Sequence, residues 1–437
     1  MLFLLDIRPF PAWSLTSPVT LASHIWAEVR QKSTDHTWGF MMGRSWGRAA
    51  LILLMAVPLS AASVAAAAQP SLAASAQGEN LLGVSAVSTT DAWAVGYKCS
   101  NADCSEPNLT YSTLIDHWNG KTWSTVASPD SGPSDQLTGV SAVSATDAWA
   151  VGNTNSGPVN TVSGPALILH WNGKKWSKTP IPEASTTYFF LNGVSAISAT
   201  DAWAIGTWDA HGVNAHALFL HWNGKKWSKV PSPSPVGRAL FGVSTTSATD
   251  AWAVGQYTNS ADRDATLTEH WNGKKWSKVA SPGPSPGEGN VLFGVSALTP
   301  TQAWAVGYWG TSLGQRTMVL RWNGKAWKRV HSPDPGSSFD VLDGVSAVSA
   351  SDAWAVGNYS SDKGGTQITL ILRWNGKTWT RVPSPSPNPD ASGVNNLAGV
   401  STVGPGRAFS AGSADDAWTG ANLALIVNWN GKTWVKR

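Results

Sequence analysis

The chain has 437 residues, a formal net charge of +4, and charged residues at only 13% of its length, against about 25% in ordinary soluble domains. A nucleic-acid binder concentrates Lys and Arg in one stripe, so this weak charge excludes DNA and RNA as partners. Ser, Thr, Asn and Gly must keep the surface wet instead, and such a composition is typical of exported proteins.

Residues 43–76 carry the organisation of an export signal. Arg44 and Arg48 form a basic start, an apolar run follows over 49–59, and small residues at 66–68 or 74–76 offer a cleavage site. We therefore expect 43–76 to be a signal peptide or, because small apolar residues continue to position 68, a weak membrane anchor. The protein would then be secreted or held at the cell surface.

Residues 1–42 precede this signal and carry no repeat. We interpret them as a mis-assigned extension, with Met41 or Met42 as the true start.

One pattern repeats seven times between residues 77 and 437. Each unit opens with Gly-Val-Ser, continues with Asp-Ala-Trp-Ala-Val-Gly or a variant of it, and ends with Trp-Asn-Gly-Lys, one further residue and Trp. A period of about 50 residues is typical of propellers and solenoids. The units start near 81, 137, 191, 240, 292, 342 and 397.

The third unit illustrates how one repeat predicts four strands, at 191–198, 202–207, 217–222 and 226–230. Asn-Gly between the last two predicts a type I′ hairpin turn, in which both residues have positive φ. The Asp of the Asp-Ala-Trp triplet stands in the first hairpin, where we expect its carboxylate to accept backbone N–H groups.

Seven such units without a helical pattern predict an all-β fold, a seven-bladed β-propeller with four antiparallel strands per blade. A superhelical array of small sheets is the alternative. Because the first unit opens on strand one and the last ends on strand four, side-chain packing should close the ring, unless the phase is shifted by one strand. Trp recurs at three positions of the repeat, with Phe409 at one of them in the last unit, and we interpret these rings as packing between blades.

The repeat L-x-G-V-S-A-x-S-x-x-D-A-W-A-V-G, followed by an apolar strand and a Gly turn with Trp, resembles those of known propellers. It is similar to the repeats of photosystem-assembly-factor and Asp-box (BNR-type) proteins, and more loosely kelch, over residues 81–437. This chain has W-N-G-K-x-W where the Asp box has S-x-D-x-G-x-x-W. That box is a structural turn, so the resemblance implies the fold and little about activity.

The two ends of the predicted blades differ. The 1–2 and 3–4 turns are short and nearly identical, whereas the 2–3 and 4–1 loops vary in length and content, which favours the variable loops as a binding face. An aromatic residue opens four of the 2–3 loops, and such rings stack on sugars or anchor a protein partner, unless they only cap blade edges. These candidate ligand-binding residues are Trp208, Tyr257, Trp309 and Tyr359.

Three other residue sets invite a functional interpretation. Cys99 and Cys104 are expected to form a local disulfide. Four histidines stand in register before the Trp-Asn-Gly motif, but their strands belong to sheets about 10 Å apart, so we expect neither a metal site nor a cofactor. A lysine after each Asn-Gly pair forms a basic ring at the opposite end, which could attract an anionic cell-wall polymer or membrane: Lys121, Lys174, Lys225, Lys274, Lys325, Lys377 and Lys432.

No residue is assigned a catalytic role. Two G-x-S-x-G stretches, 283–287 and 310–314, fall in loops between strands, where the strand-to-helix turn of a catalytic serine cannot form. We predict an exported, non-enzymatic propeller that binds a carbohydrate or a protein through its variable loops. A polysaccharide-acting enzyme, hydrolase or lyase, and a purely structural surface protein are the alternatives; convergent acids in the central funnel would favour the enzyme.

Overall fold

A computed structural model describes residues 78–437, apart from 103, 105–108, 131, 133, 156–164, 183–187, 210–214, 234–237, 261–262, 285–287, 362–365, 388–392 and 416–420. The predicted extension at 1–42 and the predicted signal at 43–76 lie outside the described residues. Within the described part, no helix has the length and apolar character needed to span a membrane.

The described residues form seven groups of four consecutive strands. Blades 1 to 4 comprise β1 (Glu79–Ser88), β2 (Asp91–Cys99), β3 (Tyr111–Trp118) and β4 (Trp123–Thr125); β5 (Ser134–Ser144), β6 (Asp147–Asn155), β7 (Ala166–Trp171) and β8 (Trp176–Lys178); β9 (Tyr188–Ser198), β10 (Asp201–Asp209), β11 (His216–Trp222) and β12 (Trp227–Val230); β13 (Arg238–Ser247), β14 (Asp250–Thr258), β15 (Asp264–Trp271) and β16 (Trp276–Val279). Blades 5 to 7 comprise β17 (Asn290–Thr299), β18 (Gln302–Thr311), β19 (Gly314–Trp322) and β20 (Trp327–Val330); β21 (Asp340–Ser349), β22 (Asp352–Ser360), β23 (Gln367–Trp374) and β24 (Trp379–Arg381); β25 (Asn395–Gly404), β26 (Arg407–Asp415), β27 (Asn422–Trp429) and β28 (Trp434–Lys436).

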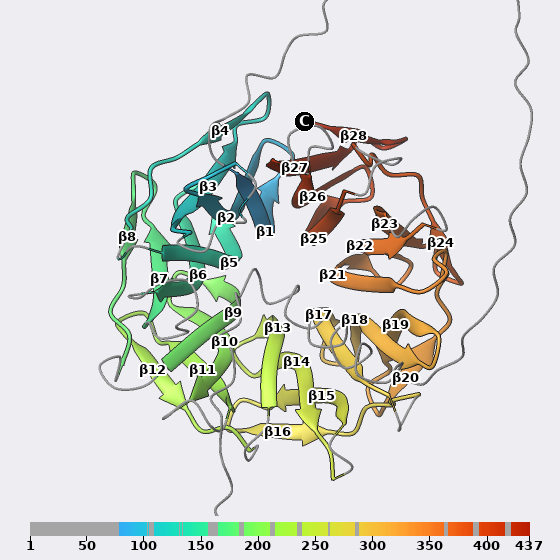
Figure 1. Cartoon of the computed structure of the whole chain (residues 1–437). Coiled ribbons are helices and arrows are strands. Elements are labelled where there is room, and N and C mark those ends of the chain that lie inside the picture. Colours follow the sequence, from blue (N-terminus) through green and yellow to red (C-terminus); the bar gives the residue numbers. More distant parts are fainter. Residues whose placement is uncertain are drawn as a thin grey trace, which may run out of the picture. The chain divides into compact units, whose positions relative to one another are not determined.

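Consecutive strands pair antiparallel within each blade. Parallel contacts between blades join Tyr111 to Ser134 and Gln367 to Val394. Figure 1 shows the sheets around a common axis, with the first strand of each blade innermost and the fourth outermost. The predicted fold class, a seven-bladed β-propeller with four antiparallel strands per blade, is confirmed. In blade 3 the four strands follow the predicted order. The inner two, β9 and β10, extend further toward the variable loops than the sequence predicted.

The Ser of each Gly-Val-Ser motif joins its blade to the next. Ser85 Oγ accepts a hydrogen bond of 3.0 Å from the backbone N–H of Ala142 in blade 2. Ser401 Oγ in blade 7 accepts the equivalent bond, also 3.0 Å, from Ala86 in blade 1, so the series closes on itself. The same bond is made by Ser141, Ser195, Ser244, Ser296 and Ser346.

The glycine of the same motif permits this close approach. A Cβ atom added to Gly139 would lie 3.2 Å from the Cα of Gly193 in the next blade, so a larger residue would push the inner strands apart. The small residues of the inner strands therefore allow the backbones to converge around the axis.

The repeated tryptophans pack across the blade interfaces. Trp149 of β6 lies with its ring centroid 4.9 Å from that of Trp222 and 5.1 Å from that of Trp227, both in blade 3. At the interface between blades 7 and 1, Phe409 takes the place of the inner Trp, 6.2 and 6.0 Å from Trp118 and Trp123. Because the strands of blades 1 and 7 stay in separate sheets, the predicted closure by side-chain packing is confirmed.

The Asn-Gly turn differs from the predicted type I′ geometry. The strand register leaves 223–226 as the loop in blade 3. Gly224 has a φ of 85°, as a left-handed turn position requires, but Asn223 does not have positive φ. Instead, Asn223 Oδ1 accepts the backbone N–H groups of Lys225 and Lys226, each at 3.0 Å. The prediction of two positive φ angles is wrong because the Asn side chain itself closes the turn.

Candidate functional site

The four predicted aromatic residues occupy one register position, the end of the second strand in blades 3 to 6. Each ring lies beneath a basic side chain from the fourth strand of its own blade. Lys229 Nζ is 3.6 Å from the ring centroid of Trp208, and Lys278 Nζ is 3.5 Å from that of Tyr257. These are contact distances for a cation–π interaction.

Blades 5 and 6 repeat the arrangement with arginine. The guanidinium carbon of Arg329 is 4.5 Å from the ring centroid of Trp309, and that of Arg381 is 4.5 Å from the centroid of Tyr359. Arg381 also donates a hydrogen bond to the Tyr359 hydroxyl. Sequence reasoning did not find these cations, although a basic residue stands two positions after the last Trp of each of these repeats.

Burial distinguishes the rings from freely exposed anchors. Trp208, Tyr257 and Trp309 are half-buried, and Tyr359 is 7% exposed. All four pack against the apolar clusters between neighbouring blades. The structure therefore brings each candidate ring together with a cation and a blade interface, and places the four rings in four separate blades.

A pocket of about 290 Å³ opens on the variable-loop end of blade 1, a site that the sequence did not indicate. It lies where the aromatic of blades 3 to 6 is replaced by Lys98, which forms an ion pair of 3.1 Å with Glu79. Its wall comes from the 2–3 and 4–1 connections: Lys98, Cys99, Ser100, Thr110, Tyr111, Ser112, Asp130 and Gly132.

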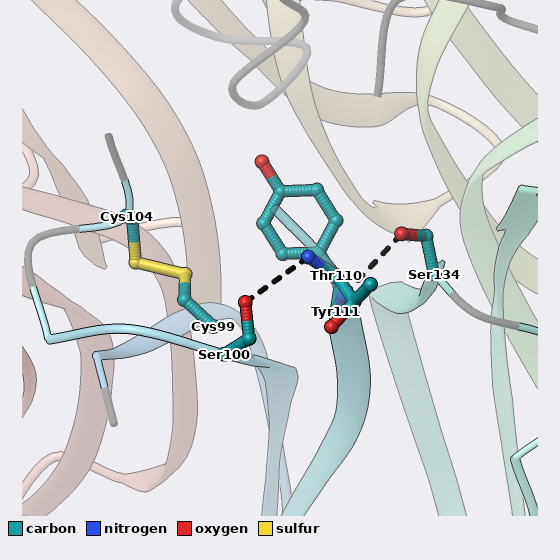
Figure 2. Close-up of a disulfide and its surroundings, with 6 residues drawn as sticks. All are labelled: Cys99, Ser100, Cys104, Thr110, Tyr111 and Ser134. Carbon is teal, nitrogen blue, oxygen red and sulfur yellow. Dashed lines mark hydrogen bonds between the residues drawn. A yellow bond between two sulfur atoms is a disulfide. The ribbon is translucent and has the colours of Figure 1, made fainter. Parts of the chain in front are cut away.

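Two features fix the shape of this pocket. The predicted disulfide between Cys99 and Cys104 is present, and it is buried against Tyr97 and Tyr111. As Figure 2 shows, Tyr111 lies between the disulfide and Ser134, whose Oγ accepts the Tyr111 backbone N–H at 3.3 Å.

Tyr111 and Asp130 are contrasting residues of the pocket lining. Burial raises the pKa of Tyr111 to about 12, so its hydroxyl keeps its proton at neutral pH. That hydroxyl oxygen is buried and has no hydrogen-bond partner among the described residues. Asp130 Oδ1 already accepts the backbone N–H and the hydroxyl of Thr113, both at 2.9 Å.

The in-register histidines each pair with an aspartate of their own blade. His221 Nε2 lies 2.9 Å from Asp201 Oδ1, and its ring packs on Trp203 with centroids 4.5 Å apart. The predicted bond from the aspartate to backbone N–H groups is replaced by this pair, because the side chains face each other across adjacent strands. The same pair joins His117 to Asp91, His170 to Asp147 and His270 to Asp250.

This side-chain pair also explains the variation between blades. In blade 6, Arg373 replaces the histidine and binds both oxygens of Asp352 at 3.1 and 3.2 Å. In blade 5, where Gln302 stands in place of the aspartate, Arg321 stacks over Trp304 instead. Among the described residues, no group of three or more His, Cys, Asp or Glu side chains could hold a metal ion.

Asp343 is a buried carboxyl group on the innermost strand of blade 6. Both of its oxygens are buried without a hydrogen-bond partner among the described residues, and burial raises its pKa to about 8 despite a smaller lowering by the Asn396 side chain. Equivalent residues in two other blades donate to the next blade: Thr138 to the Leu191 carbonyl and Asn192 to the Leu240 carbonyl, both at 2.7 Å. The other members of this ring position carry no acid: Leu82, Phe241, Phe293 and Ala398.

Comparisons with known proteins agree with the fold. No family model and no curated protein matches the chain. Among solved structures, YCF48 bound to D1 peptide is 14% identical, with a TM-score of 0.47, over 77% of this chain and 89% of its own. YCF48 from Cyanidioschyzon merolae is 14% identical, with a TM-score of 0.45, over 80% of this chain and 96% of its own.

A polysaccharide lyase, the PL25 ulvan lyase, is 11% identical, with a TM-score of 0.48, over 82% of this chain and 96% of its own. At these identities the similarity concerns the fold alone. The seven four-stranded groups of the chain itself establish that it is a β-propeller.

Proposed function

We propose that this chain is an exported, non-catalytic propeller that binds a carbohydrate or protein ligand on its variable-loop face. The observation that carries the proposal is the pocket in blade 1, because its wall is built entirely from 2–3 and 4–1 connections and their flanking strand ends. The opposite end consists of short 1–2 turns and of 3–4 turns that are closed by their own Asn side chains.

The chemistry of the pocket suits a polar ligand group. Lys98 and Asp130 supply charges of opposite sign to its wall, which also includes the hydroxyl-bearing residue Ser112. Hydroxyl and charged groups placed in this way orient a ligand, while loops of unequal length supply selectivity. Trp208, Tyr257, Trp309 and Tyr359 remain the candidate contacts on the same face of blades 3 to 6.

The test begins with the purified protein on an array of glycans, cell-wall polymers and peptides. Ser112→Trp then fills the pocket from its wall, and Thr122→Trp serves as the matched control, since Thr122 is exposed in the 3–4 turn at the other end of blade 1. We expect Ser112→Trp to weaken binding at least about tenfold, and Thr122→Trp to change it less than about twofold.

Three results would count against the proposal. Equal losses in both variants would remove the pocket from the binding site. Failure to bind any member of the array would favour the purely structural alternative, and release of shortened products from a bound polysaccharide would favour the enzyme.

A further inference from the structure

We propose that the variable-loop rim of blades 3 to 6 binds an acidic polysaccharide through four cations held over aromatic rings. These four residues, called the cation row below, are Lys229, Lys278, Arg329 and Arg381. The inference rests on the proposed binding function and adds the chemical class of the ligand.

The faces of the four aromatic rings beneath the cation row are already occupied. In each of the four blades a cation lies 3.5 to 4.5 Å from the ring centroid. In blade 3, His216 is stacked against Trp208 as well, with an interplanar angle of 17° and centroids 4.5 Å apart. A ligand that approaches this rim therefore meets positive charge and ring edges, where the sequence predicted open ring faces.

The members of the cation row are exposed and share one position in their strands. All four members of the cation row are exposed, although the rings below them are half-buried or buried. Each is the third residue of the outermost strand, two residues nearer the variable loops than the Trp that packs between blades. A charge held over a ring loses less conformational freedom on binding than a free lysine, so less of the interaction energy is spent on ordering it.

The local charge balance also favours an anion. Arg238 adds a second cation beside Tyr257, 5.0 Å from its centroid. Asp340 on this end is already bound to Arg316 at 2.8 Å, and Asp334 accepts the backbone N–H of Thr317 at 2.8 Å. Carboxylates are thus present on these blades, but two of them are engaged by partners within the fold.

The row has a definite break. Lys178 and Lys436 continue the same register position in blades 2 and 7, whereas Thr125 takes it in blade 1. There Thr125 donates a hydrogen bond of 2.8 Å to Asp116. The positive rim therefore ends beside the blade 1 pocket, so that one polymer end could enter the pocket while its length follows the rim.

An acidic polysaccharide matches this pattern better than a folded protein does. Its carboxylates recur at regular intervals along the chain, so carboxylates that are several sugar residues apart can meet successive blades in the same way. Each carboxylate accepts charge-assisted hydrogen bonds from Lys or Arg. The C–H faces of its sugar rings can pack against the aromatic edges that remain accessible. A folded partner would need a rigid surface with matching charges over four blades.

The test compares two quadruple variants with the same loss of charge. The first replaces the cation row: Lys229→Gln, Lys278→Gln, Arg329→Gln and Arg381→Gln. The control replaces the turn lysines of the same four blades at the opposite end: Lys225→Gln, Lys274→Gln, Lys325→Gln and Lys377→Gln. Binding to polygalacturonate, dextran, poly-glutamate and single-stranded RNA is measured at 0.1 M salt, and thermal melts confirm that both variants fold.

We expect polygalacturonate to bind the unmodified protein and the turn-lysine control with affinities within about twofold, and the cation-row variant at least about tenfold more weakly. If the cation-row variant fails to fold, the salt dependence of the unmodified protein replaces it. Raising salt from 0.1 M to 1 M shortens the screening length from about 10 Å to about 3 Å, and polygalacturonate binding should fall at least tenfold.

Other outcomes would overturn the inference. Equal losses of affinity in the cation-row and turn-lysine variants would show only an effect of net charge. Binding of poly-glutamate or RNA as tight as that of polygalacturonate would remove the specificity for acidic sugars. Salt-insensitive binding of dextran, unaffected by either variant, would refute the inference but leave the proposed binding function intact. Failure to bind any array or polymer ligand would refute both.

Discussion

Asp343 is the residue whose surroundings oppose its charge most strongly. Ordinary aspartate titrates near pH 3.8, whereas burial raises the pKa of Asp343 to about 8. At neutral pH the group therefore keeps its proton in the folded protein and loses it in the unfolded chain. A protonated carboxyl can donate a hydrogen bond, as Thr138 and Asn192 do at the equivalent positions.

This shift predicts that stability falls as pH rises. The contribution of Asp343 to the free energy of unfolding is complete below pH 4, where the folded protein and the unfolded chain both hold the proton. It is lost progressively as pH rises through about 8. We expect Asp343→Asn to remove this slope, because Asn does not titrate and Asn192 already occupies this position in blade 3. Urea unfolding between pH 4 and 8 measures it; parallel slopes for both proteins would contradict the prediction.

Replacing a tryptophan in blade 3 and one in blade 5 should lower the stability of the protein by different amounts. Trp203 is 1% exposed in the contact between blades 3 and 4, so Trp203→Ala should cost roughly 3–5 kcal/mol. Trp309 is half-buried at the rim, and Trp309→Ala should cost about 1 kcal/mol. Chemical denaturation of both variants is the measurement, and equal losses would show that Trp309 belongs to the core.

At the scale of the elements, the four-residue turn shows how local chemistry determines strand pairing. One Asn side chain binds two backbone N–H groups, and one Gly takes the left-handed conformation. The two strands then leave the turn with the packing tryptophans opposite each other. Seven copies of this turn explain why the blades are so alike at this end.

Gly224→Ala should destabilise blade 3 by roughly 1–2 kcal/mol. Its φ of 85° is unfavourable for alanine, and the added Cβ would lie 3.0 Å from the Thr200 Cβ. The control is Lys225→Ala in the same turn, whose backbone N–H bond to Asn223 is kept. A thermal melt of the two variants checks the prediction, which fails if both have the same midpoint.

The whole molecule depends on closing the ring. Blade 1 shares no strand with blade 7. Closure includes the Phe409 contacts, the bond from the Ala86 N–H to Ser401 Oγ, and a backbone bond of 2.8 Å from the Asn422 N–H to the Ala102 carbonyl. Each blade buries its two faces only against its neighbours, as in other repeat proteins. An interface lost at one place leaves two apolar faces in water.

Deleting residues 397–437 should therefore abolish cooperative unfolding. The deletion exposes Trp118 and Trp123 on one side and Trp354 on the other, all of which pack against blade 7. Thermal unfolding followed by circular dichroism should broaden or lose its transition. A sharp transition at an unchanged midpoint would show that the seventh blade is not needed to close the structure.

The sequence by itself determined the repeat, the four strands of each blade, the packing role of the tryptophans and the disulfide. These features follow from signals within one repeat: apolar periodicity, Asn-Gly turns and the small residues of the inner strand. The seven repeats of one pattern also indicated a ring, because each unit needs a neighbouring unit on both of its faces.

Only the tertiary structure decided what each polar side chain faces. The His–Asp pairs, the cations over the four rings and the blade 1 pocket join residues on different strands, or in loops about 20 to 30 residues apart in the chain. Such partners lie on different strands or in different loops, so they depend on which side chains these segments bring together and not on the pattern within one strand. The same rings that the sequence placed on an open binding face thus lie beneath lysine and arginine side chains, and the rim presents charge to a ligand.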